Sequence, residues 1–134
     1  MSNKVVIRLS EVTEEKIEGF GPGFIMRNPI SPQTVGAKNL RVGYNIFPPK
    51  SGTAIHRHPG EEAWYVLKGR GFLRVGDKKY NFEAGCFMFI PSDVVHQTVN
   101  TGDEPLEYIF AVSPPFDVSK NVILEPFTEK HLSE

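Results

Sequence analysis

The chain has 134 residues and a mass of 15.0 kDa, the size of one domain that buries about two-thirds of the surface its unfolded form exposes. Its formal net charge of −1 excludes the strongly basic balance typical of nucleic-acid partners. One cysteine, Cys86, excludes an internal disulfide. We see neither a signal-peptide pattern nor an apolar run near the roughly twenty residues of a membrane span. We therefore expect a cytoplasmic protein with neither nucleic acid nor membrane as partner.

The first 39 residues predict an irregular N-terminal arm. Residues 5–9 form a short β-prone run, and the polar residues 10–18 predict one helical turn. Residues 19–24 contain three glycines and a proline, a density that breaks regular structure. This segment is interpreted either as a mobile lid with two aromatic tips or, with more weight, as an ordered surface connection.

Residues 40–113 are predicted to form an all-β core. Apolar and polar residues alternate from Leu40 to Phe47, a period of two that indicates a strand. Further strands are predicted over residues 53–58, 62–67, 71–75, 79–82, 86–90, 96–99 and 106–112. Turn residues recur every eight to twelve positions between them, as in a sandwich or barrel. A C-terminal extension, 114–134, holds one more apolar run at 122–124.

Two histidines and a glutamate in the middle of the chain predict a metal site. His56 and His58 are two apart and therefore face the same side of a strand. A turn-prone Pro59-Gly60 dipeptide then allows Glu62 on the next strand to reach the same point. Imidazole and carboxylate ligands suit Fe, Mn, Ni, Zn or Cu. The alternative is that these are ordinary polar residues of a barrel without metal.

The spacing of these residues resembles the paired motifs of the cupin superfamily, in its small, single-domain prokaryotic form. The matching pattern is His56-x-His58-x3-Glu62-x6-Gly69, followed by Gly85-x5-Pro91-x-Asp93-x2-His96-x3-Asn100. The resemblance spans roughly residues 42–112 and implies a double-stranded β-helix, or jelly-roll barrel. It further implies that His56, His58, Glu62 and His96 hold one divalent metal, while the glycines, Pro91 and Asn100 shape turns and strand ends.

Two positions depart from the family pattern, and neither is a ligand. Asp93 stands where a glycine is usual, and aspartate tolerates left-handed geometry better than most residues. Lys50 replaces another usual glycine, six residues before His56. We expect a small local cost at these positions and an intact site.

Strand parity suggests which other side chains line the pocket. Trp64 and Val66 share the parity of Glu62, and Thr98 shares that of His96. Core packing is the alternative for Trp64. We interpret Cys86 as a buried structural residue and His131, in the polar tail, as a solvated one.

The resemblance implies a metal-dependent enzyme acting on a small molecule. Because the pocket candidates are apolar and no general acid or base is evident beyond the ligands, we expect dioxygenase-like chemistry ahead of a non-redox isomerase, decarboxylase or lyase. A non-catalytic small-molecule-binding protein is the alternative from another class. We also expect a homodimer, paired through the spare runs 5–9 and 122–124.

Overall fold

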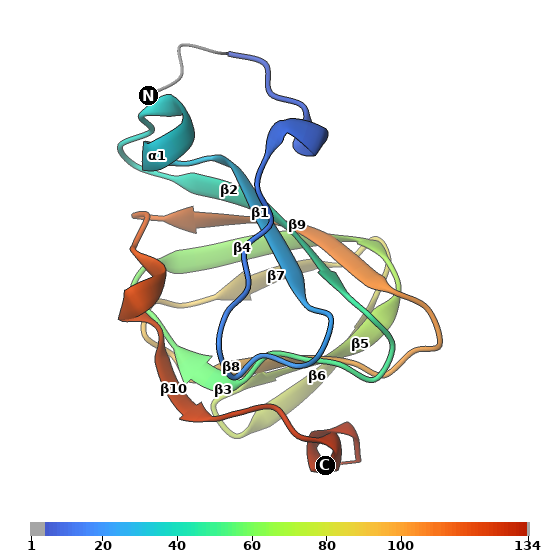
Figure 1. Ribbon diagram of the computed structural model, residues 1–134. Helices are drawn as coiled ribbons and strands as arrows, with labels where there is room; N and C mark the ends of the chain where they lie inside the picture. The colour runs from blue at the N-terminus through green and yellow to red at the C-terminus, as the bar shows by residue number, and fades with distance from the viewer. Residues whose placement is uncertain (1–4, 134) are drawn as a thin grey trace.

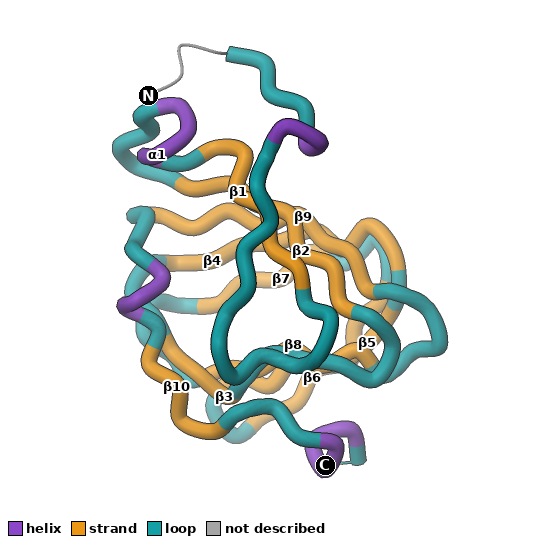
Figure 2. The backbone as a smooth tube through the Cα atoms, in the orientation of Figure 1, coloured by secondary structure: helices purple, strands orange, loops and turns teal. Residues whose placement is uncertain are grey.

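A computed structural model describes residues 5–133. Its described residues form two antiparallel sheets, one ordered β1-β2-β9-β4-β7 and the other β10-β3-β8-β5-β6. Figures 1 and 2 show the first sheet facing the second, with the chain passing repeatedly from one to the other. The strands are β1 (Ile25–Ile30), β2 (Arg41–Phe47), β3 (Ile55–Arg57), β4 (Glu61–Lys68), β5 (Arg70–Val75), β6 (Lys78–Glu83), β7 (Phe87–Ile90), β8 (His96–Asn100), β9 (Leu106–Ser113) and β10 (Val122–Glu125).

The predicted all-β jelly-roll barrel is confirmed. Side chains of alternating parity from both sheets meet between them, as the pattern of strict burial and exposure along β2 and β9 shows. Phe47, Val66, Leu106 and Val112 are almost completely buried there. An apolar cluster packs between the sheets, and the buried side chains also include polar ones, among them the three motif histidines.

The N-terminal arm differs from its prediction. Residues 5–9 form no strand: Val5 and Val6 are 91% and 82% exposed, and Leu9 begins the short 3-10 helix η1 (Leu9–Glu11). A β-prone run without a neighbouring strand to pair with gains nothing from extended geometry. The sequence prediction also missed β1, which contains Pro29, and the short α1 (Pro32–Val35). Proline is tolerated because β1 is an edge strand whose register shifts between Arg27 and Ile30.

The prediction of a solvated His131 was wrong, because this side chain is completely buried. After η2 (Val118–Lys120), β10 pairs with β3, and η3 (Glu129–Leu132) then folds the tail back on the barrel. The backbone N–H of Thr128 donates to His131 Nδ1 at 3.0 Å, and Nε2 lies 3.2 Å from Glu125 Oε1. These contacts make the tail part of the fold. Cys86 is half-buried and packs against the core.

Lys50 and Asp93, which replace usual glycines, adopt the backbone conformation that glycine favours. Their φ angles are 60° and 62°, in the left-handed region, while Gly69 and Gly85 have φ angles of 95° and 93°. The N–H of Asp93 donates to the carbonyl of His58 at 2.9 Å. The turn at Asp93 therefore holds the backbone of His58 in place. No helix in residues 5–133 is long and apolar enough to cross a membrane.

Lys50→Gly is expected to raise the free energy of unfolding by about 1 kcal/mol. The backbone of Lys50 is held in a left-handed conformation that costs non-glycine residues about 1–2 kcal/mol. Urea denaturation measures the change. As a mirror control, Gly76→Ala should lower stability by a similar amount, since its φ is +61° and an added Cβ meets no atom within 4 Å. A destabilised Lys50→Gly variant would contradict this account.

Candidate metal centre

The three histidines converge because of strand register. His56 on β3 and His96 at the start of β8 are direct cross-strand partners and so face the same side. His58 lies two residues after His56 and keeps its parity. The ring centroids of His56 and His96 are 4.2 Å apart, and that of His58 is 5.0 Å from His96. One nitrogen from each ring lies within 4.8 Å of the others, a separation that one ion can bridge.

Backbone carbonyls orient all three rings in the same way. His56 Nδ1 contacts the carbonyl oxygen of Ala54 at 2.7 Å, His58 Nδ1 that of Pro59 at 3.0 Å, and His96 Nδ1 that of Val94 at 2.8 Å. A carbonyl can only accept, so each Nδ1 carries a proton and donates. In the neutral rings of His56 and His96 the Nε2 lone pair is then free, whereas His58 Nε2 contacts a carboxylate at 3.0 Å. A contact at Nδ1 of this kind orients metal-binding histidines.

Glu62 reaches the histidines from the opposite sheet. It lies on β4 in the first sheet, whereas β3 and β8 belong to the second. Its Oε1 is 3.0 Å from His58 Nε2 and 3.8 Å from His96 Nε2. The carboxylate side chain is only 12% exposed. The four predicted ligands therefore lie together, and an ion held among them would join the two sheets.

The environment sets the protonation of this cluster. Burial, reinforced by the nearby His96, lowers the pKa of His56 to about 3, and burial also lowers the pKa of His96. For His58 burial acts the same way, but the hydrogen bond and charge of Glu62 outweigh it and raise the pKa. Burial opposes ionisation of Glu62, yet the contact with His58 and the neighbouring imidazoles lower its pKa. At neutral pH His56 and His96 are neutral and Glu62 is ionised, the forms that bind a metal. The contact with Glu62 favours a protonated His58, which must lose that proton to bind a metal.

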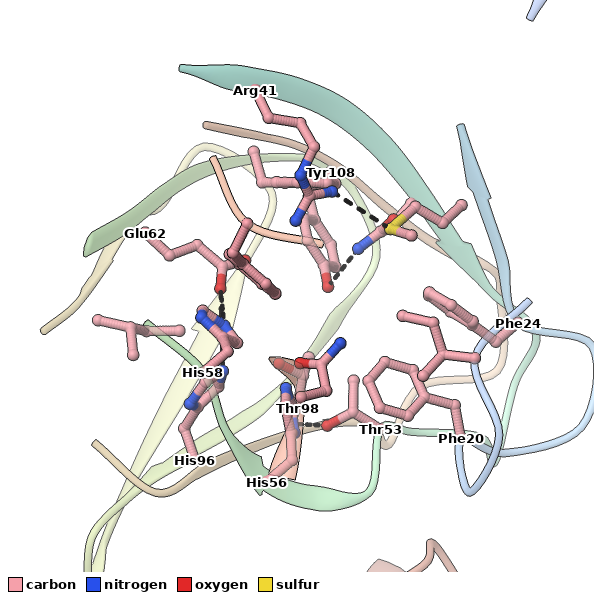
Figure 3. A pocket seen from close by; sticks show the side chains of 17 residues that line it. Phe20, Phe24, Arg41, Thr53, His56, His58, Glu62, His96, Thr98 and Tyr108 are labelled. Atoms are coloured by element: carbon pink, nitrogen blue, oxygen red, sulfur yellow. Dashed lines mark hydrogen bonds and ion pairs between the residues drawn. The ribbon is translucent and has the colours of Figure 1, made fainter. Parts of the chain in front are cut away.

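A cavity that is partly open to solvent adjoins the four residues. Figure 3 shows the histidines on one side of it and Phe20 and Phe24 on the other. Of the three side chains expected to line it, Thr98 does, whereas Trp64 and Val66 pack in the core. Trp64 has the parity of Glu62 but lies roughly 7 Å further along β4, where it stacks on Tyr108 at 4.0 Å. Parity fixes the face of a strand, but a neighbouring ring can still separate a side chain on that face from the cavity, as Tyr108 does for Trp64.

Several lining residues were missed because their strands carry no ligand that fixes their parity. Arg41 and Asn45 on β2 and Tyr108 and Phe110 on β9 all face the cavity. The alternation along β2 pointed to the other face, because its apolar residues Val42, Tyr44 and Ile46 are only half-buried and the set that contains Arg41 and Asn45 is buried. Asn45 Nδ2 donates to the Tyr108 hydroxyl at 3.0 Å. Burial and the charge of Glu62 raise the pKa of Tyr108, so the hydroxyl keeps its proton.

The glycine-rich segment 19–24 forms part of the cavity wall. Phe20 lies 5.1 Å from the His56 ring and 4.9 Å from Phe24, centroid to centroid. The N–H of Gly21 donates to the carbonyl of Gly52 at 2.7 Å, and the N–H of Phe127 to that of Gly19 at 2.9 Å. The segment is thus held by backbone hydrogen bonds on two sides, as an ordered connection would be.

The residues present fit a divalent transition metal. The donors are three imidazole nitrogens and one carboxylate, all largely buried, with a cavity beside them that has both apolar and polar walls. Such a set suits Mn, Fe, Ni, Zn or Cu and leaves open positions on an ion that prefers six ligands. The described part of the chain thus has the chemistry for a site that also receives a small molecule.

Known proteins share both fold and motif with this chain. The cupin domain model matches residues 43–112. An oxalate-binding protein of Thermotoga maritima is 31% identical over 112 residues, 81% of this chain and 93% of that protein. An uncharacterised protein of Methanocaldococcus jannaschii is 27% identical over 90% of this chain and 99% of its own length. The structure of the polyketide cyclase RemF from Streptomyces resistomycificus covers 98% of this chain and 94% of its own, with a TM-score of 0.74 and 21% identity.

These findings place the chain in a class of small β-barrel proteins. The chain belongs to the cupin family.

The stability of the metal-free protein is expected to fall as pH drops below about 6.5. In the unfolded chain His56 takes up a proton near its ordinary pKa of 6.5, whereas the folded chain resists this until about pH 3. Each pH unit in this window therefore removes about 1.4 kcal/mol of stability through His56 alone. Urea denaturation at several pH values, for the original chain and for His56→Gln, measures the slope. Equal slopes in the two proteins would contradict the assignment.

Proposed function

We propose that this cupin holds one divalent transition metal on His56, His58, His96 and Glu62 and is an enzyme acting on a small molecule in the adjoining cavity. The observation that carries the proposal is the common orientation of the imidazoles, each with Nδ1 donating to a backbone carbonyl. These contacts leave the Nε2 side of each ring to face an ion, and one nitrogen from each ring lies within 4.8 Å of the others.

Non-redox chemistry on an oxygen-bearing substrate is the first reaction class. When bound, the metal would supply a Lewis acid that polarises a substrate carbonyl or carboxylate. The cavity wall is largely apolar, as expected, but Asn45, Thr98 and Tyr108 add polar groups that can contact an oxygen-bearing substrate. The Tyr108 hydroxyl is placed to donate to an oxygen on which negative charge develops. The names of the oxalate-binding relative and of a polyketide synthase relative, CurC of Streptomyces cyaneus, point to oxygen-rich ligands.

Dioxygenase chemistry is the second candidate, favoured by the aromatic part of the cavity wall. Phe20, Phe24, Phe110 and Phe116 line it and exclude water from one side. Such a wall suits an apolar substrate beside an ion with open positions, as the sequence prediction assumed. The third candidate is a protein that binds a small molecule without catalysis, and assays of turnover and oxygen uptake distinguish it from both enzyme classes.

Protein expressed without added metal is expected to contain about one equivalent of a divalent transition metal, measured by mass spectrometry. His96→Ala should lose most of it, and Glu62→Gln should weaken affinity by about 10- to 100-fold. Arg57→Ala is the matched control, since this side chain lies between two ligands but points to solvent. Equal metal content in all four proteins would contradict the proposed ligand set.

The same preparation separates the two reaction classes. The metal-loaded protein is mixed with each of a panel of small carbonyl and carboxylate compounds. An oxygen electrode measures oxygen consumption, and chromatography measures the turnover of each compound. Turnover with no oxygen uptake supports the first class, and stoichiometric uptake supports the second. Tight binding with no turnover of any compound would contradict the proposed enzyme activity and indicate a binding protein.

We further propose a homodimer formed through the outer face of the first sheet. The run 5–9 forms no strand, and the run 122–124 lies on β10, the edge strand of the second sheet, which pairs with β3. Large apolar side chains instead gather on the outside of β4, β7 and β9, namely Tyr65, Leu67, Phe87, Phe89 and Ile109. Phe87 is 81% exposed on the edge strand β7. Patches of this kind on small proteins mark contacts with other chains.

Sedimentation at micromolar concentration is expected to give the mass of a dimer. Phe87→Asp combined with Phe89→Asp should shift it to the monomer, because a charge would be buried in the interface. Tyr80→Asp, half-exposed on β6 of the other sheet, is the control and should stay dimeric. A monomeric original chain would overturn the proposal.

A further inference from the structure

One positive charge inside the barrel has no role in holding the predicted metal ligands. Arg41 on β2 is 7% exposed, and its guanidinium lines the same cavity as His58 and Glu62. Figure 3 shows it extending from β2 toward the middle of the cavity, above the histidines. A buried arginine must remain charged under ordinary conditions, so the site has to compensate it.

The protein itself compensates this charge only in part. Arg41 Nη1 donates to Asn28 Oδ1 at 2.7 Å and lies 3.8 Å from Met26 Sδ. Arg41 Nε is buried and has no hydrogen-bond partner among residues 5–133. No carboxylate of the described chain lies within ion-pair distance of the guanidinium, and Glu62 and Glu15 act on it only from further away. The side chain therefore keeps unused capacity to donate.

Two aromatic rings flank the guanidinium and shape the space beside it. Its carbon lies 5.1 Å from the ring centroid of Phe110 and 5.1 Å from that of Phe116. Phe116 in turn stacks on the His58 ring, with centroids 4.5 Å apart. The Phe116 ring thus contacts both the Arg41 guanidinium and the His58 imidazole. Arg41 and the predicted metal ligands therefore belong to one site.

Strand register places Arg41 and Glu62 in one row. Both are cross-strand partners of Val112, Arg41 from β2 and Glu62 from β4. Residues in one row of a sheet face the same side, and two strand spacings separate their Cα atoms by about 10 Å. Their side chains then approach each other over Val112, so a small molecule can contact both ends of this row at once.

We infer that Arg41 is an anion-binding residue that holds the carboxylate of a small organic acid whose other end reaches the metal position. The planar guanidinium matches a carboxylate in two-pronged geometry. A divalent ion together with Arg41 outweighs the single negative charge of Glu62, so a neutral ligand would leave the cavity with excess positive charge. The rings of Phe110 and Phe116 favour an acid with a flat apolar body. This inference rests on the proposed function for the part played by the metal.

The experiment compares binding of benzoate and benzamide, which have similar shape and different charge. Calorimetry measures both on zinc-loaded protein and again after chelator treatment. Arg41→Met is expected to weaken benzoate binding by about 10- to 100-fold and to change benzamide binding by less than about twofold. Arg41→Lys should fall between, because lysine keeps the charge but loses the planar fork.

Arg70→Met is the matched control, since it also removes one positive charge but from an exposed site on β5 outside the cavity. Its benzoate affinity should equal that of the original chain. Circular dichroism and zinc content are measured on every variant, and Arg41→Lys carries the test if Arg41→Met does not fold.

The outcomes separate this inference from the metal proposal. Loss of benzoate affinity in Arg41→Met with full zinc content supports the anion site. Unchanged benzoate affinity in a folded Arg41 variant, or preference of the original chain for benzamide, overturns it and leaves Arg41 a structural residue bound to Asn28. If the original chain takes up no zinc, the metal proposal fails, while the effect of Arg41 on the chelator-treated protein still decides the anion site.

Discussion

The structure depends on the closure of two sheets around one cluster of polar side chains. Three imidazoles from β3, β8 and the turn after β3 meet a carboxylate from β4, which belongs to the other sheet. Burying four such groups is unfavourable unless each is satisfied. Backbone carbonyls satisfy each Nδ1, and the remaining nitrogens and the carboxylate face one another. A metal ion would satisfy this centre completely, which ties the stability of the barrel to its function.

The ligand set could be predicted from sequence because it depends on local rules. Two-residue periodicity places His56 and His58 together, and the turn at Pro59-Gly60 brings Glu62 back toward them. Even the departures from the family pattern obey local geometry, since Lys50 and Asp93 take the left-handed conformation of the glycines they replace. His96 required more, because its partnership with His56 is a long-range pairing that only the family resemblance implied.

What the sequence could not provide is side-chain packing, edge position and long-range contacts. Trp64 has the right parity for the cavity but stacks on Tyr108, which lines the cavity in its place. β1 was hidden by Pro29, which only an edge strand accommodates. His131 is buried because the tail returns to the barrel, a contact between segments far apart in the chain. Arg41 was missed for the same reason, since its face is fixed by its pairing with β9.

The central claim is that the four residues bind one metal ion that joins the two sheets. A crystal structure of the protein with its natural metal, measured at the absorption edge of that metal, tests this most directly. The account predicts one anomalous peak about 2.0–2.3 Å from the Nε2 atoms of His56, His58 and His96 and from a carboxylate oxygen of Glu62. A peak elsewhere, or coordination through any Nδ1 atom, would contradict it.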